Sequence, residues 1–390
     1  MRESGVRQGI RRGASIGLAL ICSGAAGIGA GVVHASNAGA AGGRAHSRVA
    51  AGSVVRTAAV GTAPVAVAVD EKTNRAFVLS GDSVSVVDAA SGKTLSRVDG
   101  GVGGDPYGAG PASIAVDVTS GRVFAANFGA GTVSVLDASS GRLSRTVRVG
   151  NGPGAVAIDE RTKRVFVANF DGDSVSLLDA GSGAVLRTVT VGQAPDAVAV
   201  DTRTGYAFVA NYNGNSVSVL DATTGSFVRT ATVGLHPIDA AVDEGTGHLF
   251  TANWDDSTVS VLDTTTAKVL STIPVGVSPV TVRVNAAGKA YVANYTGNSV
   301  SVLDSKRLKV TSTISVGALP SALTIDARSG YAFVTNTGSN NVSVLDTRKN
   351  SVTRTVAVGQ SPNAVAVSVG KAHAFVTNGQ DNNVSVLAAG

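Results

Sequence analysis

The chain repeats itself about every 42 residues, and this period constrains its fold more than any other feature. A valine that opens a short V-S-V/L run recurs eight times, with successive spacings of 49, 42, 42, 42, 41, 42 and 42 residues. The eight positions are Val84, Val133, Val175, Val217, Val259, Val300, Val342 and Val384. A constant period in the forties is typical of stacked units, none of which can bury its apolar face alone. We therefore expect one domain built from eight copies of a small unit.

Each unit contains four short apolar runs and lacks helical periodicity. In the fourth unit the runs are Ala197–Val200, Ala207–Ala210, Ser216–Leu220 and Phe227–Val233. Turn sequences such as Asp201–Gly205 separate them, because Asp accepts backbone hydrogen bonds at the start of a turn and Gly supplies a positive φ at its end. Four strands in 42 residues predict an all-β unit, a four-stranded antiparallel blade.

The second and third runs also carry a family resemblance. The motif Y/F-V-A-N-Y/F followed by S-V-S-V-L-D, seen at Tyr291–Asp304, resembles the YVTN family of β-propeller repeats found in surface-layer-type and YncE-type exported proteins. The resemblance extends over residues 53–388 and implies a β-propeller without a catalytic motif. Propellers of that family commonly have seven blades, so seven is the alternative count to the eight repeats of this chain.

The two ends of the repeat region predict how the ring closes. Residues 53–60 match the fourth strand of a unit, whereas 384–387 match a third strand. A last blade made of 364–388 and 53–60 would join the ends and leave no open sheet edge. We therefore predict an eight-bladed β-propeller over 53–390, closed by the N-terminal strand.

The N-terminal segment reads as an export signal. Four arginines precede a small, apolar run over residues 14–33, and small-residue cleavage sites end at Ala35 and Ala38. We expect a signal peptide at 1–38, a flexible leader at 39–52, and a secreted, periplasmic or cell-surface protein without a transmembrane span in the mature chain. The single cysteine, Cys22, lies within the signal, so no disulfide is expected.

The location of the net charge of +5, outside the propeller, argues against a nucleic-acid function. Residues 1–38 carry +3, and Arg44 and Arg48 in the leader add +2, which leaves the propeller neutral. A nucleic-acid-binding domain generally needs a basic surface to neutralise phosphates.

One face of the propeller concentrates the non-repeated residues. In an antiparallel blade, the turns between the second and third strands (b–c turns) lie at the same end as the links between blades, and we call this the upper face. Five consecutive b–c turns begin with a large ring, which we call the aromatic arc: Phe128, Phe170, Tyr212, Trp254 and Tyr295. The arc predicts either a stacking platform for a glycan or single strand, or an extension of the inter-blade core. The scarcity of other large aromatic residues favours core.

The fifth unit departs most from the repeat. His236 lies in its link, and Asp255 and Asp256 follow Trp254 in its b–c turn. A histidine beside carboxylates can act as a base or metal ligand, or form a chance surface cluster. A metal site needs three or four convergent ligands, so we predict no metal and no cofactor. Tyr107 and Asp105, in the glycine-rich insertion of the first link, complete the candidate ligand-binding set.

A ring of asparagines closes the second strands, and we interpret it as structural. Each is expected to cap its own turn through an Asx-type bond. The positions are Asn127, Asn169, Asn211, Asn253, Asn294, Asn336 and Asn378.

These observations predict an exported, non-catalytic binding or cell-envelope surface module. The partner would be a protein or glycan of the envelope, bound on the upper face by a monomer. The first alternative is a lactonase- or lyase-like propeller enzyme that uses His236, Asp255 and Asp256. The second is a single-stranded nucleic-acid binder. G-x-S-x-G occurs only at residues 13–17, inside the expected signal peptide, and H-E-x-x-H and paired cysteines do not occur, so we assign no catalytic residue.

Overall fold

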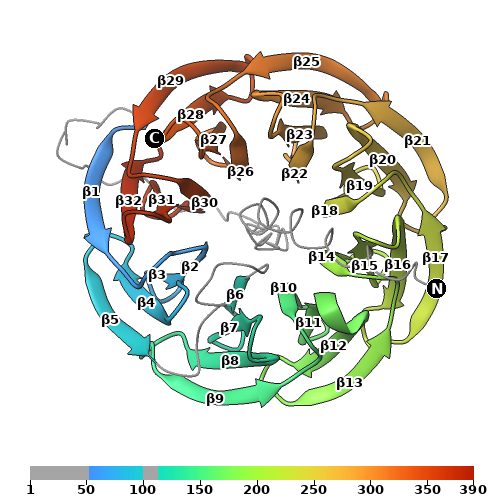
Figure 1. Cartoon of the computed structure of the whole chain (residues 1–390), viewed down its shortest axis with the longest axis horizontal. Coiled ribbons are helices and arrows are strands. Elements are labelled where there is room, and N and C mark those ends of the chain that lie inside the picture. The colour runs from blue at the N-terminus through green and yellow to red at the C-terminus, as the bar shows by residue number, and fades with distance from the viewer. Residues whose placement is uncertain (1–51, 100–112) are drawn as a thin grey trace, which may run out of the picture.

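The computed structural model describes residues 52–99 and 113–390, and this part of the chain forms a ring of eight four-stranded antiparallel blades (Figure 1). In every blade the first strand lies nearest the centre of the ring and the fourth forms its circumference. The prediction of an eight-bladed propeller is confirmed. Besides strands, the described residues form one 3-10 turn, η1 (Phe170–Gly172).

The strands of the first four blades are short and regular. Blade 1 consists of β2 (Ala66–Asp70), β3 (Arg75–Leu79), β4 (Ser83–Asp88) and β5 (Thr94–Asp99). Blade 2 consists of β6 (Ile114–Asp117), β7 (Arg122–Asn127), β8 (Thr132–Asp137) and β9 (Leu143–Arg148). Blade 3 consists of β10 (Pro153–Asp159), β11 (Arg164–Asn169), β12 (Ser174–Asp179) and β13 (Val185–Thr190). Blade 4 consists of β14 (Pro195–Asp201), β15 (Tyr206–Asn211), β16 (Ser216–Asp221) and β17 (Phe227–Thr232).

The remaining blades continue the same pattern. Blade 5 consists of β18 (Pro237–Asp243), β19 (His248–Asn253), β20 (Thr258–Asp263) and β21 (Val269–Pro274). Blade 6 consists of β22 (Pro279–Val284), β23 (Lys289–Asn294), β24 (Ser299–Asp304) and β25 (Lys309–Ser315). Blade 7 consists of β26 (Pro320–Asp326), β27 (Tyr331–Asn336), β28 (Asn341–Asp346) and β29 (Ser351–Ala357). Blade 8 consists of β30 (Pro362–Ser368), β31 (His373–Asn378), β32 (Asn383–Ala388) and β1 (Val54–Ala59).

The ring closes as the sequence predicts. β1 pairs antiparallel with β32, with Val54 opposite Leu387 and Ala58 opposite Val384 (Figure 1). The Gly52 amide extends this ladder by donating to the Ala388 carbonyl at 2.7 Å. The first and last strands therefore share one blade, and the seven-bladed alternative is wrong.

The core lies between neighbouring blades because the second and third strands of every blade are covered on both sides. A fully buried Phe occupies the middle of the second strand in seven blades, and Tyr291 takes that place in blade 6. Burial of such a ring stabilises the fold by about 1.5–3 kcal/mol. The Tyr291 hydroxyl donates to the Thr347 carbonyl of blade 7 at 2.9 Å, and burial raises the pKa of Tyr291 to about 12.

The turns of the lower face, opposite the upper one, follow the predicted Asp-to-Gly chemistry. In blade 2, the Asp137 carboxylate accepts hydrogen bonds from the Ser139 hydroxyl at 2.6 Å and the Ser140 amide at 2.7 Å. These bonds favour the ionised form and lower the pKa of Asp137 to about 2. Gly141 closes the turn with φ 70°. Asn350 has φ 53° at the equivalent position of blade 7, as expected for the residue that best replaces Gly there.

Among the helical segments of the described residues, none has the length and apolar character of a membrane span.

Candidate functional site

The framework of the upper face depends on the asparagine ring. The Asn294 amide donates to the hydroxyls of Ser299 and Ser301, both at 3.0 Å, on the neighbouring strand β24. The glycine that opens the link into each of blades 3 to 8 lies directly against the equivalent Asn side chain: a Cβ on Gly276 would lie 2.5 Å from Asn294 Nδ2. These asparagines are structural, as interpreted from the sequence, but the expected Asx-type bond within each turn is wrong. The amides join two strands instead of capping their own turns, because the side chains are buried beneath the links.

The links are tied to the preceding blade. The residue before the link proline adopts a left-handed conformation, with φ 52° at both Ala194 and His236. Its amide donates to the last side chain of the preceding b–c turn: Asp173 accepts from Ala194 at 2.8 Å, and Asn215 accepts from His236 at 2.9 Å. Side chains in these links are therefore presented from a fixed backbone.

The aromatic arc is both core and surface. Its ring centroids lie 6.4 Å apart for Phe128 and Phe170, 6.3 Å for Phe170 and Tyr212, and 5.6 Å for Trp254 and Tyr295. Tyr212 is 9% exposed, and the other four are half-buried. The rings of blades 3 to 6 pack on a cluster of small apolar side chains that includes Ile238, Ala252, Val280 and Ala293. The half-buried rings of blades 3 to 6 thus rest on the core and keep part of their surface open.

Blade 5 adds a polar pair to the arc. The His236 ring stacks on Tyr212, with centroids 4.4 Å apart and an interplanar angle of 20°. Its Nδ1 lies 2.6 Å from Asp255 Oδ2, and the two side chains are 31% and 47% exposed. The Trp254 amide donates to the His236 carbonyl at 3.0 Å, which fixes the link against the b–c turn. The structure therefore brings together Tyr212, His236 and Asp255, whose chemistry suits proton transfer or binding of a polar ligand.

Asp256 belongs to the framework. Its Oδ2 accepts from the Leu235 amide at 2.6 Å, and Asp381 makes the equivalent bond to the Gln360 amide at 2.8 Å in blade 8. Within residues 52–99 and 113–390, no group of three or more His, Cys, Asp or Glu side chains is arranged to hold a metal ion.

Two other histidines connect neighbouring blades by hydrogen bonds on the lower face. His248 Nδ1 lies 2.9 Å from the Ser305 carbonyl, and His373 Nδ1 lies 2.8 Å from the Ala89 carbonyl. Both carbonyls follow the third strand of the next blade, so these rings join blades far from His236. Tyr107 and Asp105 lie outside the described residues.

The sequence reasoning missed a charged pair between the inner strands of blades 5 and 6. Asp239 Oδ2 accepts from the Val282 amide at 2.9 Å, the Thr281 hydroxyl at 2.9 Å and Arg283 Nη1 at 2.7 Å. Asp239 and Arg283 interrupt a pattern in which most blades have Ala at these positions, such as Ala197 and Ala199 in blade 4. Aligning the repeats by their inner strands would have found both.

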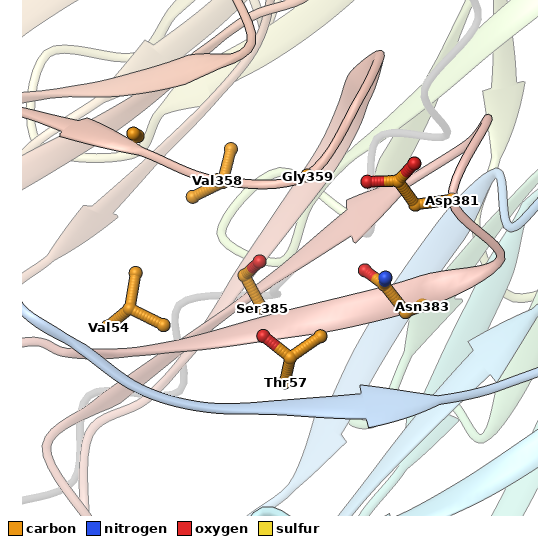
Figure 2. A pocket seen from close by; sticks show the side chains of 8 residues that line it. Val54, Thr57, Val358, Gly359, Asp381, Asn383 and Ser385 are labelled. Carbon is orange, nitrogen blue, oxygen red and sulfur yellow. The ribbon is translucent and has the colours of Figure 1, made fainter.

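A separate groove lies at the seam between blades 7 and 8, with a volume of about 390 Å³. Figure 2 shows Thr57 of β1 and Ser385 and Asn383 of β32 facing the segment at Val358. Asn383 and Ser385 already accept hydrogen bonds from Asn378, at 2.7 and 2.9 Å. The groove is thus lined partly by framework groups, and the aromatic arc is the stronger candidate site.

Comparisons with known proteins support the fold. Neither a protein-family model nor a curated protein matches the chain. A solved structure of Kuenenia stuttgartiensis hydrazine synthase is similar with a TM-score of 0.60 and 18% identity, over 72% of this chain and 95% of that chain. The dihydro-heme d1 dehydrogenase NirN in complex with DHE is similar with a TM-score of 0.66 and 15% identity, over 81% of this chain and 73% of that chain. At this identity the likeness shows the propeller fold alone.

Proposed function

We propose that the protein is an exported β-propeller that binds a protein or glycan of the cell envelope on its upper face, without catalysis. The observation that carries this proposal is the uneven distribution of the aromatic arc. The buried asparagines and the turn aspartates recur in nearly every blade, as structural residues of a repeat do. The arc occupies only blades 2 to 6, and four of its five rings stay partly open. Concentrated aromatic surface with a few fixed polar groups is typical of binding sites.

Export rests on the N-terminal segment, with its arginines, apolar run and small-residue cleavage sites. Mass spectrometry of the protein recovered outside the cytoplasm should show a mature chain that begins after Ala35 or Ala38. Recovery of the intact chain solely from the cytoplasm would refute this part of the proposal.

The binding surface can be tested with envelope fractions. We expect immobilised mature protein to retain an envelope component, and the double variant Phe170→Leu with Tyr295→Leu to lose most of it. Phe227→Leu is the matched control, because Phe227 is 49% exposed on the outer strand β17, away from the arc. Thermal unfolding of each variant separates lost binding from lost folding. Equal retention by the folded double variant would show that the arc is not the site.

The second candidate function is a lactonase- or lyase-like propeller enzyme. The 2.6 Å contact between His236 and Asp255 favours it, because a carboxylate that orients an imidazole is the usual arrangement of a general base. Turnover of small lactones that disappears in both His236→Ala and Asp255→Ala would establish this function in place of the first.

A further inference from the structure

The upper face has an uneven charge. The b–c turns and links within residues 52–99 and 113–390 contain six aspartates and no Lys or Arg. These aspartates are Asp82, Asp171, Asp173, Asp255, Asp256 and Asp381. The turns of the lower face carry charges of both signs, and Lys306, Arg307 and Lys349 are among the positive ones. Arg97 of β5 pairs with Asp82 at 2.8 Å, and none of the other five aspartates forms an ion pair with a Lys or Arg of the described residues. The propeller is neutral as a whole, so the negative charge of these described turns is a local property of that surface.

The carboxylates nearest the arc are fixed and reach solvent. Asp173 and Asp256 each use one oxygen to accept a link amide, at 2.8 and 2.6 Å. Asp171, Asp255 and Asp256 are exposed, in the same turns as Phe170 and Trp254. Because backbone amides hold Asp173 and Asp256 in place, little conformational entropy of these two side chains is lost when they bind a partner.

The molecule already displays the mode of recognition that such a surface offers. The His236 ring lies against the face of Tyr212 at 4.4 Å and against Asp255 at 2.6 Å, between an aromatic ring and a carboxylate. A guanidinium and an ammonium favour an aromatic face and a carboxylate as neighbours. Phe170 with Asp171 and Trp254 with Asp255 offer the same two chemical groups to an incoming cation.

We propose that the partner presents a cationic segment, rich in Arg or Lys, to the aromatic arc and its aspartates. This inference rests on the proposed function and specifies the chemistry of the ligand. Cation–π contacts and charge complementarity both favour Arg and Lys side chains at this surface, whereas phosphate or sulfate polymers would meet like charge.

The test uses the mature protein and a fluorescently labelled peptide of alternating Arg and Gly, followed by fluorescence anisotropy. A peptide with Glu in place of Arg and a neutral oligosaccharide are the two comparison probes. We expect only the Arg peptide to bind, with an affinity that falls as NaCl rises from about 20 mM to about 500 mM, since exposed charges are screened.

Two variants locate the binding. Trp254→Leu and Asp255→Asn should each weaken the Arg peptide about 5- to 30-fold, in line with a lost cation–π or charge contact. Asp255 is exposed, so its variant should fold even if Trp254→Leu does not. Phe227→Leu on the rim and Glu160→Gln on the lower face are matched controls and should bind as the wild type does.

Three outcomes would overturn the inference. Equal binding of the Glu peptide, binding of the neutral oligosaccharide with displacement of the Arg peptide, or an unchanged affinity in Asp255→Asn each contradicts a cationic ligand at this surface. If retention of the envelope component still requires Phe170 and Tyr295 but the Arg peptide does not bind, the proposed function stands and only the ligand chemistry is wrong. If neither ligand responds to upper-face variants, both proposals fail.

Discussion

On the lower face, third strands end in Asp and turns close through a residue with positive φ, and the same bonds recur from blade to blade. On the upper face, the Asn-to-hydroxyl bonds also recur, but the residues displayed above them vary around the ring. Phe170, Tyr212 and Trp254 begin three successive b–c turns, whereas Gly379 stands there in blade 8. The lower face therefore mainly maintains the ring, whereas the buried asparagine framework of the upper face leaves its surface free to specialise.

The largest expected effect on stability comes from disrupting the buried asparagine framework of the upper face. Gly276→Ala would place a Cβ 2.5 Å from an Asn294 amide that is held by two hydroxyls, and we expect the free energy of unfolding to fall by about 2–3 kcal/mol. Chemical denaturation measures this loss.

Gly121→Ala is the matched control on the lower face. Gly121 has φ 67° and open space around its Cβ position, so only the left-handed backbone strain applies, about 1 kcal/mol. If both substitutions cost the same, the upper framework is not the tighter of the two.

Next in size is the turn chemistry of the lower face. Asp137→Ala removes the bonds to Ser139 and Ser140 and should cost about 1–2 kcal/mol at neutral pH. The pKa of Asp137 is lowered to about 2, below its value in the unfolded chain. Its contribution is therefore complete above pH 4 or so and disappears as the pH falls towards 2. Denaturation curves of wild type and variant should converge over that range, and a constant difference down to pH 2 would contradict the assignment.

The smallest effect on stability should come from the specialised surface. His236→Ala removes the contact of Nδ1 with the Asp255 carboxylate and a stacking contact with Tyr212, and we expect the free energy of unfolding to fall by less than about 1 kcal/mol. Differential scanning calorimetry can measure it beside Gly276→Ala. A loss of stability as large as that of Gly276→Ala would mean that His236 belongs to the buried framework. The displayed residues would then not be separate from that framework.

Much of the fold was predictable because it repeats. Eight V-S-V/L runs, the Asp-to-Gly turns and the match of residues 53–60 to a fourth strand indicated the number of blades and their closure. The position of His236 and Asp255 on one face also followed from the antiparallel order of the strands, which puts b–c turns and links at the same end. The asparagine bonds were misjudged because an Asn at a strand end can cap a turn or reach across a hairpin, and only its burial under Gly276 and its counterparts decides between the two.

The strands and turns could be read from the sequence alone, because hairpin chemistry and a two-residue alternation are local. The eight blades and the closing strand could be read as well, because the repeat supplies their number and the missing fourth strand. Only the tertiary structure separated Asp255 from Asp256. The first carboxylate faces an imidazole and the second accepts from the Leu235 amide, although the two are adjacent in the chain. It also placed Asp239 beside Arg283 across two blades. Such contacts depend on how one blade packs and twists against the next, to within an ångström, and a repeat pattern carries no distance of that kind.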